Sequence, residues 1–277
     1  MHRQGLLLRS AISLKRLFTK ARSRLGLLSP SAFFVRRALD ARIAVKRNGL
    51  KVFQIYNYSK LSAYRANSFE SKEPETLEWI DSMHSSSVLF DVGANVGIYS
   101  LYAATRKVKC IAFEPSALNY AQLNLNIKLN KLQKWITAFP LACHSNLFVS
   151  VFHLKSMEWA SALSSFDRPI DQFGEVYEPL FSQGAVGMAL DDLCDQIEVY
   201  PTHLKIDVDG NEAFVVSGAT KILSHYVQSV LIELSSCRDD HVGLVAKIEA
   251  FGFRLISDGL HEAGAANVNK NLIFKRS

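Results

Sequence analysis

The sequence has few cysteines, no long uncharged apolar run and almost no acid near its start. Its four cysteines stand singly among 277 residues: Cys110, Cys143, Cys194 and Cys237. They have neither the paired spacing of a zinc site nor the density of a disulfide framework, so we expect reduced thiols and a cytoplasmic location. Because no run of about 18 uncharged apolar residues occurs, no transmembrane helix is expected. Arg9 interrupts the first apolar run, which argues against a secretory signal.

Positive charge is concentrated at the start of the chain. The net charge of +6 divides into +11 for residues 1–48, whose single acid is Asp40, and −5 for the remainder. The dipeptide Asn48-Gly49, a common turn, marks the change. We therefore predict a basic helical N-terminal extension over residues 1–48 and an α/β domain over residues 49–277.

The extension has helical periodicity. One face of the first predicted helix is apolar: Leu7, Ala11, Leu14, Phe18, Ala21 and Leu25. A second helix is expected over Ala32–Lys46. Such a basic amphipathic segment can pack on its own domain or a second subunit, contact the inner membrane surface through residues 1–28, bind nucleic acid, or act as an organelle presequence. The sequence leaves these alternatives open.

From Leu50 onward, short apolar runs alternate with helical stretches, which is typical of βαβ units. We predict a doubly wound, mainly parallel sheet with helices at Glu73–Ile80 and Leu118–Asn130. The expected strands are Ser87–Asp91, Ile111–Glu114, Phe148–His153, His203–Asp207, Val230–Leu234, Phe251–Ser257 and Asn271–Lys275.

A glycine-containing turn follows the strand that ends at Asp91. Gly93 allows a tight turn and close approach of the backbone to a ligand, and Gly97 allows the next helix to pack on the strand. Glu114, at the tip of the following strand, can accept hydrogen bonds from both hydroxyls of a ribose. These features predict a nucleotide-cofactor site.

Asn95 stands where the dinucleotide fingerprint G-x-G-x-x-G requires its middle glycine. A pyrophosphate needs bare backbone close by, so this substitution argues against NAD. The carboxylate and ammonium groups of S-adenosylmethionine suit the acid of Asp91 and the amide of Asn95 better. The alternative is an ordinary strand–turn–helix in which Asp91 caps the helix.

Four motifs occur in order along the chain: Phe90–Gly97, Phe113–Pro115, Leu190–Leu193 and Leu204–Glu212. Together they resemble the motif set of FkbM-type methyltransferases over roughly residues 70–275. The resemblance implies the Rossmann-like, seven-stranded class I methyltransferase fold, S-adenosylmethionine as cofactor, and O-methylation of sugars or hydroxylated natural products. It also places Ala142, after the third strand, near the adenine. Ser145 stands where this family tends to have an acid, which leaves the adenine contact open.

The fourth motif contains the candidate catalytic residues. Lys205 and Asp207 point to the same face of a strand, and Asp207 lies at the carboxyl edge, where open α/β sheets bind ligands. We predict that Asp207 is the base for the acceptor hydroxyl, and that Lys205 holds it or stabilises a developing oxyanion. Asp209 and Glu212 have the spacing of a capping box, so at least one of them is expected to begin the next helix.

Glu233, at the end of the following strand, is the third candidate catalytic residue. Asp207 and Glu233 could together hold Mg²⁺, but the sequence shows no third ligand, so we predict no metal. The irregular segment Glu158–Gly187 is expected to cover the acceptor. Its larger side chains either stack on a sugar or anchor the loop: Trp159, Arg168, Phe173, Tyr177 and Phe181.

These observations predict an S-adenosylmethionine-dependent O-methyltransferase that acts on a saccharide or a related hydroxylated metabolite. An RNA methyltransferase that uses the basic extension is one alternative. Nucleic acid is not the expected partner, because the domain lacks positive charge and a known RNA-binding module. A non-catalytic cofactor-binding assembly protein is the other alternative, since a fold does not guarantee activity.

Overall fold

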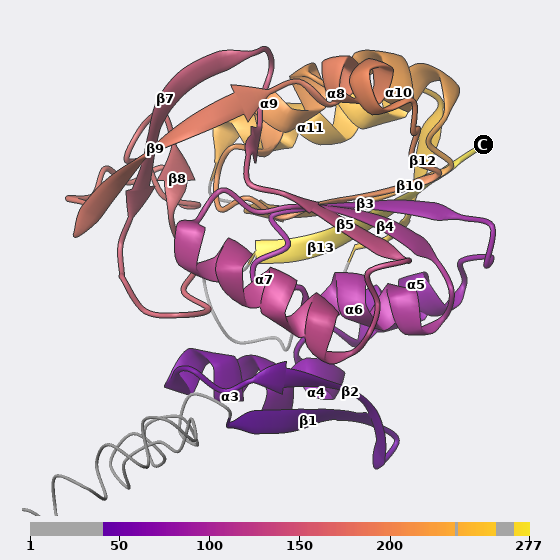
Figure 1. Ribbon diagram of the computed structural model, residues 1–277. Helices are drawn as coiled ribbons and strands as arrows, with labels where there is room; N and C mark the ends of the chain where they lie inside the picture. Colours follow the sequence, from indigo (N-terminus) through magenta and orange to yellow (C-terminus); the bar gives the residue numbers. More distant parts are fainter. Residues whose placement is uncertain (1–40, 236–237, 259–268) are drawn as a thin grey trace, which may run out of the picture. The chain divides into compact units, whose positions relative to one another are not determined.

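The computed structural model describes residues 41–235, 238–258 and 269–277 (Figure 1). The helix predicted over residues 7–25, the first part of the helix predicted over Ala32–Lys46, and Cys237 lie outside these ranges. The unit Arg42–Ser277 is compact and is described by itself. Within the described ranges, Cys110, Cys143 and Cys194 are buried and free. In the same part of the chain, no helix combines the length and apolarity needed to cross a bilayer.

A mixed sheet of seven strands forms the centre of the unit. The strands are β3 (Val88–Val92), β4 (Lys109–Phe113), β5 (Ile136–Phe139), β10 (His203–Ile206), β11 (Ser229–Ser235), β12 (Phe253–Ser257) and β13 (Asn269–Arg276). Their order across the sheet is β12-β13-β11-β10-β3-β4-β5. The five strands from β11 to β5 pair in parallel, whereas β13 runs antiparallel to both β11 and β12. The mixed sheet therefore results from the direction of one strand, β13.

Six of the seven predicted strands belong to this sheet. The prediction for Phe148–His153 is correct as a strand, but that strand lies in a second, smaller sheet. The edge position of the main sheet is occupied instead by β5, the strand before Ala142. Ile136 is buried, but Thr137 is exposed and the strand is short, so its apolar pattern is weak.

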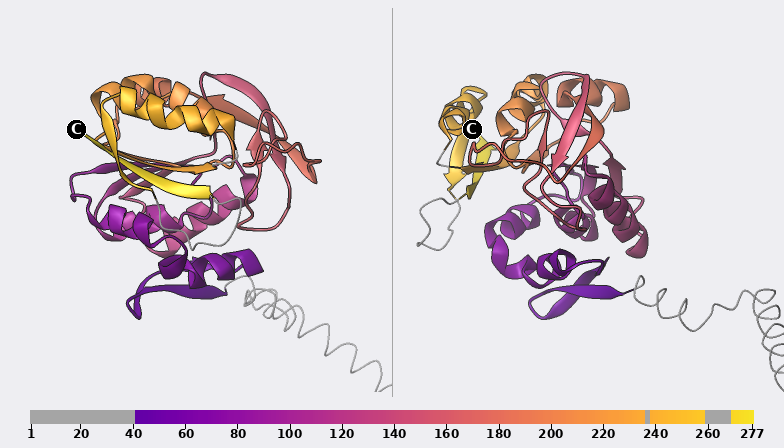
Figure 2. Two further views of the ribbon diagram at one scale, coloured as in Figure 1. Left: turned by 180° about the vertical axis from the view of Figure 1, so that it is seen from behind. Right: turned by 90° about the vertical axis from the view of Figure 1, so that its left-hand side faces the viewer.

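Two helical layers cover the main sheet (Figures 1 and 2). One layer contains α5 (Pro74–Asp81), α6 (Ile98–Thr105) and α7 (Ala117–Leu129), and the other contains α8 (Leu190–Ile197), α9 (Glu212–Ser217), α10 (Thr220–His225) and α11 (Asp239–Ala250). Leu89 and Cys110 face the first layer, and Phe90 and Ile111 face the second. Because both faces are covered, the central strands are nearly continuous apolar runs.

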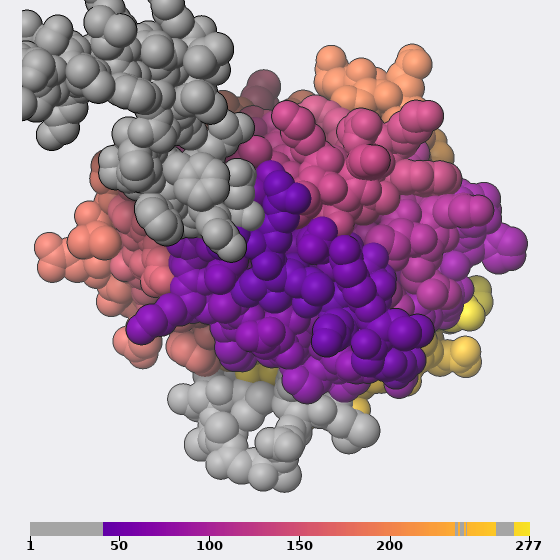
Figure 3. Space-filling view, turned by 60° about the horizontal axis from the view of Figure 1, so that its bottom comes forward, coloured from indigo at the N-terminus to yellow at the C-terminus, as the bar shows by residue number. Residues whose placement is uncertain are grey.

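The first described residues form a hairpin, β1 (Arg42–Arg47) and β2 (Leu50–Tyr56), followed by α3 (Lys60–Asn67) and α4 (Phe69–Lys72). The helix predicted through Lys46 is therefore wrong from Arg42 onward. Asn48 and Gly49 both have positive φ and form the hairpin tip, a turn that Asn-Gly strongly favours. The predicted boundary thus falls at the tip of the hairpin. Figure 3 shows this segment covering one side of the unit.

A four-stranded sheet lies beside the carboxyl edge of the main sheet (Figure 1). It contains β6 (Ala142–Cys143), β7 (Phe148–Leu154), β8 (Ser165–Phe166) and β9 (Phe181–Met188), in the order β6-β9-β7-β8. The segment Glu158–Gly187 is therefore not irregular throughout, because its last residues form β9. Figure 2 shows the long connection between β7 and β9 from two further sides.

Candidate active site

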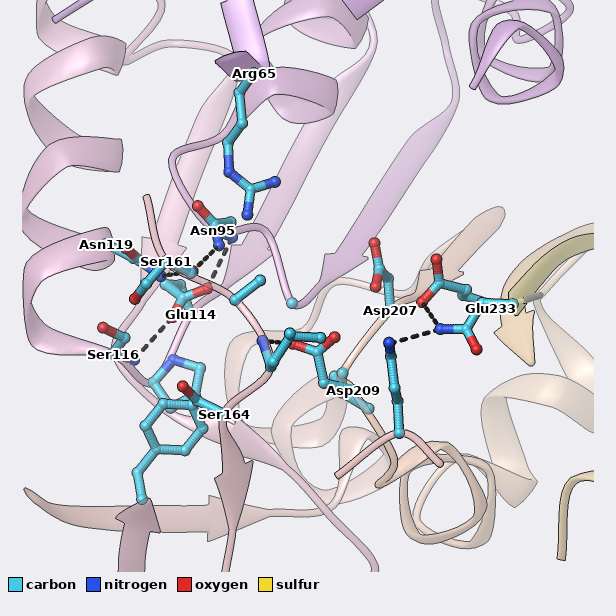
Figure 4. A pocket seen from close by; sticks show the side chains of 18 of the residues that line it. Arg65, Asn95, Glu114, Ser116, Asn119, Ser161, Ser164, Asp207, Asp209 and Glu233 are labelled. Atoms are coloured by element: carbon cyan, nitrogen blue, oxygen red, sulfur yellow. Dashed lines mark hydrogen bonds between the residues drawn. The ribbon is translucent and has the colours of Figure 1, made fainter. Parts of the chain in front are cut away.

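A cavity of about 320 Å³ lies at the carboxyl edge of the main sheet. The turns after β3, β4 and β10 line it, together with the end of β11 and the connection after β7 (Figure 4). Arg65 from α3 also reaches it. Segments far apart in the sequence meet here because parallel strands bring their carboxyl ends to one edge.

The glycine turn after β3 forms one wall of this cavity. A Cβ on Gly93 would lie 1.8 Å from the carbonyl oxygen of Asp207, so no other residue fits there. Glycine is also favoured at position 97, because its φ of 86° is one that other residues rarely adopt and its Cβ would lie 2.3 Å from Leu123 Cδ1. Asn95 has a φ of 51°, and its Nδ2 donates to the Ser161 carbonyl at 2.6 Å. The turn is thus held tightly against Asp207, which follows β10, and against the loop that contains Ser161.

Glu114 is buried in the cavity wall with both carboxylate oxygens engaged. Its Oε2 accepts from the Asn95 N–H and its Oε1 from the Ser116 N–H, each at 2.8 Å. Burial raises the pKa of Glu114 to about 7, although these two N–H groups favour the charged form. Each carboxylate oxygen has a second lone pair, so Glu114 can still accept ligand hydroxyls.

Three of the six predicted cofactor-binding residues line this cavity, and three do not. Gly93, Asn95 and Glu114 line it. Asp91 is buried behind the turn, where its Oδ2 accepts from Ser100 Oγ at 2.6 Å and burial raises its pKa. Gly97 packs on α7, and Ala142 lines a small apolar cavity nearby that shares Pro115 and Phe152 with the main one.

Lys205 is a fully buried cation among carboxylates. Its Nζ lies 2.8 Å from Asp207 Oδ2 and above the ring of Tyr99. Burial acts to lower the pKa of Lys205, but the negative charges of Asp207, Asp91 and Glu73 raise it overall. Lys205 therefore stays charged and orients Asp207, while Asp207 itself reaches the cavity.

Three carboxylates gather at the far end of the cavity from Glu114 (Figure 4). Oxygens of Asp207, Asp209 and Glu233 lie within 4.8 Å of one another. The register pairs Ile206 with Ile232, so Asp207, just after β10, lies beside Glu233, which is still within β11. The Asp209 side chain accepts from the Leu163 N–H at 2.7 Å, and that of Glu233 from Asn269 Nδ2 at 3.1 Å.

The proton affinities of these three carboxylates differ. Burial and the charge of Asp207 raise the pKa of Asp209 to about 7. Burial, with Asp207 and Asp209 nearby, raises the pKa of Glu233 well above its ordinary range. Burial would also raise the pKa of Asp207, but the charges of Lys205 and Lys72 hold it below the usual value. Asp207 is thus the carboxylate that stays charged.

Sequence reasoning overlooked Asp209. Helix α9 begins at Glu212 with Asn211 as its N-cap, so Glu212 starts the helix as expected but Asp209 does not cap it. Glu212 Oε1 instead accepts from the N–H groups of Val208 and Gly210, which holds the turn that carries Asp209. The signal was available, because Asp207 and Asp209 are two residues apart just beyond a strand.

The predicted aromatic cover is also different in the structure. Residues 161–164 and Gln172 line the cavity, but none of Trp159, Phe173, Tyr177 and Phe181 is among the described residues that do. Trp159 packs against Tyr58 with ring centroids 4.9 Å apart, and Tyr177 donates to the His153 carbonyl. They anchor loops. Phe152 of β7 supplies the aromatic ring in the cavity wall.

Residues 91–255 match the family model of the methyltransferase FkbM domain. The match covers more than half of the chain and includes the turn after β3, Glu114 and all three carboxylates. The chain belongs to this family. Methyltransferase sdnD of Sordaria araneosa is similar to it, with 25% identity over 202 residues, which is 65% of this chain and 78% of that protein.

Solved methyltransferase structures are also similar to this FkbM family member. Methyltransferase FkbM from Methylobacillus flagellatus KT is 16% identical, with a TM-score of 0.47, over 78% of this chain and 54% of that one. The aTrm5 protein, solved in complex with tRNALeu, is 14% identical, with a TM-score of 0.49, over 86% of this chain and 53% of that one. This chain thus spans about half the length of both.

The family motif Leu190–Leu193 has a structural role in this member. Asp191 accepts from the backbone N–H groups of Lys221 and Ile222 and from the Thr220 hydroxyl. It therefore caps α10 and ties it to α8, on the far side of the sheet from Lys205. Arg65 lies before the family match, so the family motifs do not identify it.

Proposed function

We propose that this protein is an S-adenosylmethionine-dependent O-methyltransferase whose acceptor is a hydroxyl of a saccharide or a related hydroxylated metabolite. The observation that carries the proposal is the division of the cavity. Glu114 lies at one end beside Asn95, Ser116 and Arg65, and Asp207, Asp209 and Glu233 lie at the other (Figure 4). One end suits a nucleoside and the other a cationic group beside a hydroxyl.

The cavity fits the cofactor in size and in polar groups. Its volume of about 320 Å³ is within the range of small-molecule sites. Glu114 would accept from the ribose hydroxyls, and the carboxylates would face the positive sulfonium and ammonium groups. Arg65 donates through Nε to the Ala160 carbonyl and lines the cavity, so its other N–H groups suit the cofactor carboxylate. When bound, S-adenosylmethionine supplies an electrophilic methyl group on a positively charged sulfur.

The residues of the chain would orient the acceptor hydroxyl and remove its proton. Asp207, held by Lys205, would accept a hydrogen bond from the hydroxyl and aim its oxygen. Asp209 would take the proton, because a base with a pKa near the working pH transfers protons most effectively. Glu233, whose pKa is raised by burial and by Asp207 and Asp209, would share a hydrogen bond with an oxygen atom of the acceptor.

A polyhydroxylated acceptor suits this end of the cavity better than RNA. Carboxyl groups and the amides of Gln172 and Asn269 bind hydroxyl groups well, whereas the charged carboxylate of Asp207 disfavours a phosphate. Residues 49–277 also carry a net charge of −5. A phosphate backbone requires Lys and Arg contacts that such a surface does not favour.

Calorimetry and mass spectrometry test the proposal. The purified protein should bind S-adenosylhomocysteine and should not bind NAD, because Asn95 replaces the glycine that a pyrophosphate needs. Extract supplied with isotopically labelled S-adenosylmethionine and the protein should yield a new methylated compound. Binding of NAD without S-adenosylhomocysteine would overturn the proposal. Cofactor binding with no methylated product would favour the non-catalytic assembly protein.

Glu114→Ala should weaken S-adenosylhomocysteine binding by about 1.5–3 kcal/mol, the contribution of hydrogen bonds to a charged group. Glu178→Ala is the matched control, because Glu178 is exposed and is not among the residues that line the cavity. Calorimetric titration of both variants measures the difference. Equal affinities would remove Glu114 from the cofactor site.

A further inference from the structure

A buried histidine of α11 contacts two of the elements that carry the carboxylates of the cavity. His241 is 3% exposed, lies in the first turn of α11 and is not among the residues that line the cavity. Its Nδ1 accepts from the Ser235 N–H at 2.9 Å, and its Nε2 lies 3.1 Å from Glu212 Oε2. Ser235 ends β11, the strand of Glu233, and Glu212 begins α9, directly after the turn of Asp209.

These contacts determine which ring nitrogen of His241 carries the proton. Because Nδ1 accepts from a backbone N–H, it has no proton of its own. The proton of the neutral ring is therefore on Nε2, which faces the carboxyl group of Glu212. Within the part of the chain that the structure describes, Nε2 and Glu212 Oε2 have only each other as a polar partner.

Glu212 is 1% exposed, and its two oxygens contact different elements. Oε1 accepts from the Val208 N–H at 3.3 Å and from the Gly210 N–H at 3.1 Å, whereas Oε2 faces His241. A buried carboxyl group needs a partner on each oxygen, because an unsatisfied polar atom is costly. Without His241, Oε2 would turn toward another donor or water, and Oε1 would move with it because both oxygens belong to one rigid group.

The turn that Glu212 holds contains Asp209 in an unfavourable conformation. Asp209 has a φ of 55°, in the left-handed region that residues other than glycine adopt at a cost. Such a conformation persists where the surrounding structure fixes it. Glu212 fixes the backbone on either side of Asp209, and the Leu163 N–H fixes its side chain. If Glu212 moved, the turn would relax and Asp209 would leave its position beside Asp207 (Figure 4).

We propose that His241 is a positioning residue which, through Glu212, holds the turn Val208–Gly210 so that Asp209 stays in the cavity wall. Its bond to Ser235 also ties this turn to the end of β11. Helices α9 and α11 pack against each other, which places the ring between them (Figure 1). The effect of His241 on methyl transfer rests on the proposed function, in which Asp209 takes the proton. Its effect on the turn does not.

Two amide variants separate the two contacts of His241. In His241→Asn the side-chain oxygen takes the place of Nδ1 and can still accept from Ser235, but the side chain is too short to reach Glu212. In His241→Gln the longer side chain brings an amide N–H to the place of Nε2, where it can donate to Glu212. His225→Gln is the control, because His225 is exposed in the last turn of α10.

Hydrogen exchange followed by NMR tests the turn in the full-length protein without a ligand. In His241→Asn the amides of Val208 and Gly210 should exchange about tenfold faster than in wild type, the effect of a lost hydrogen bond. The amides of β4 in the same sample should keep their rates. His241→Gln and His225→Gln should exchange as wild type does.

Three exchange results would overturn the proposal. The first is an unchanged rate at Val208 and Gly210 in His241→Asn. The second is an equal acceleration at the turn and in β4, which is the sign of a general loss of stability. The third is the same acceleration in His241→Gln as in His241→Asn, which would show that the contact with Glu212 has no role.

Turnover with labelled S-adenosylmethionine and the acceptor found in extract tests the chemistry. His241→Asn should lower turnover about 10- to 100-fold, since a small misplacement of a reacting group can cost that much. The residual turnover of Asp209→Asn should not fall further when His241→Asn is added, because the effect passes through Asp209. Losses that multiply would contradict the proposal. Wild-type protein without methyl transfer would instead refute the proposed function, while the exchange rates would still decide how the turn is held.

Discussion

At the scale of single residues, Lys205 controls the charge balance beside the cavity. It is 1% exposed and has Asp207, Asp91 and Glu73 around it. A buried charge is tolerated only when it is paired and hydrogen-bonded. Lys205 meets this condition through Asp207, so it is better placed to position a carboxylate than to meet an acceptor oxygen itself.

Asp207→Asn should lower turnover about 10²–10⁴-fold while the fold survives. Asparagine keeps the size of the side chain and can still accept from Lys205, but it loses the negative charge that orients the acceptor. Steady-state kinetics with labelled S-adenosylmethionine and the acceptor found in extract would measure the effect. Asp195→Asn is the matched control, because Asp195 also pairs with a lysine but lies on the surface.

Unchanged turnover in Asp207→Asn would remove Asp207 from the mechanism and leave Asp209 and Glu233 as the candidates. The same assay tests our prediction that no metal is needed. The structure adds Asp209 as the third carboxylate that the sequence did not reveal. The absence of a third ligand was the ground for that prediction, so with Asp209 present the need for a metal is decided by this assay. Loss of turnover with a chelator and recovery with Mg²⁺ would contradict that prediction.

The titration of Asp209 makes a prediction about stability. Its pKa of about 7 in the folded protein is above the ordinary value of 3.8, so the folded state binds the proton more tightly than the unfolded state. The contribution of Asp209 to stability must therefore fall as the pH rises from about 4 to 7. Asp209→Asn removes this loss. Urea denaturation should show the variant more stable than wild type above pH 7 and equal to it below about pH 4.

A pH-independent difference between Asp209→Asn and wild type would contradict this prediction. Asp167→Asn is a suitable control, because Asp167 is more exposed and is not among the residues that line the cavity. The unfolding free energy of the control should respond to pH as that of wild type does.

At the scale of elements, the connection over residues 160–164 joins the two ends of the cavity. The Ser161 carbonyl accepts from Asn95 Nδ2 at 2.6 Å and from Asn119 Nδ2 at 3.0 Å. The Ala160 N–H donates to Asn119 Oδ1 at 3.0 Å. The connection is thus attached to the turn after β3, to α7 and, through Asp209, to the turn after β10.

Asn119→Asp should weaken S-adenosylhomocysteine binding about tenfold and lower the melting temperature. The carboxylate can still accept from Ala160 but cannot donate to Ser161, and it places a buried charge against that carbonyl. Asn124→Asp, on the same helix, is the control, because Asn124 is exposed and its amide donates to the helix backbone at the Tyr120 carbonyl. Calorimetry and thermal unfolding would check both variants. Wild-type affinity in Asn119→Asp would show that the connection does not shape the cofactor site.

At the scale of the whole molecule, the role of the basic extension stays a prediction. Residues 1–28 carry strong positive charge, and three roles give different results on their deletion. If the extension packs on the domain, deletion should lower the melting temperature, because a matching apolar patch becomes exposed. If it contacts membranes, deletion should abolish binding to anionic vesicles and preserve activity on a soluble acceptor. We expect the first result.

The dependence of binding on salt distinguishes a nucleic-acid role of the extension from packing and from membrane contact. A nucleic-acid role should give RNA binding in the full-length chain that weakens steeply with salt, in proportion to the phosphates neutralised. Full-length protein that fails to sediment with anionic vesicles at low salt would eliminate membrane contact. A melting temperature unchanged by the deletion would eliminate packing.

Local patterns in the sequence were enough to predict most of the fold. Alternation of apolar runs with helical stretches identified six strands of the main sheet, because parallel strands covered on both faces are apolar throughout. Gly93 and Glu114 were predicted as cofactor-site residues for a similar reason. A tight turn after a strand and an acid at the next strand tip depend on neighbours in sequence, and the φ of 83° at Gly93 favours glycine whatever surrounds it.

Tertiary structure alone decided which side chains share the cavity. Arg65, Ser164 and Asn269 come from segments far apart in the chain, and no periodicity connects them. The sequence could not show that Asp91 is a structural acid and not a ligand-binding one. Only the folded structure shows that Asp91 accepts a hydrogen bond from Ser100. The pKa of Asp209 was also beyond the sequence, since it depends on burial and on the nearby charge of Asp207. Local conformation follows from neighbouring residues, whereas the environment of a buried polar group follows from chain segments that only the folded sheet brings together.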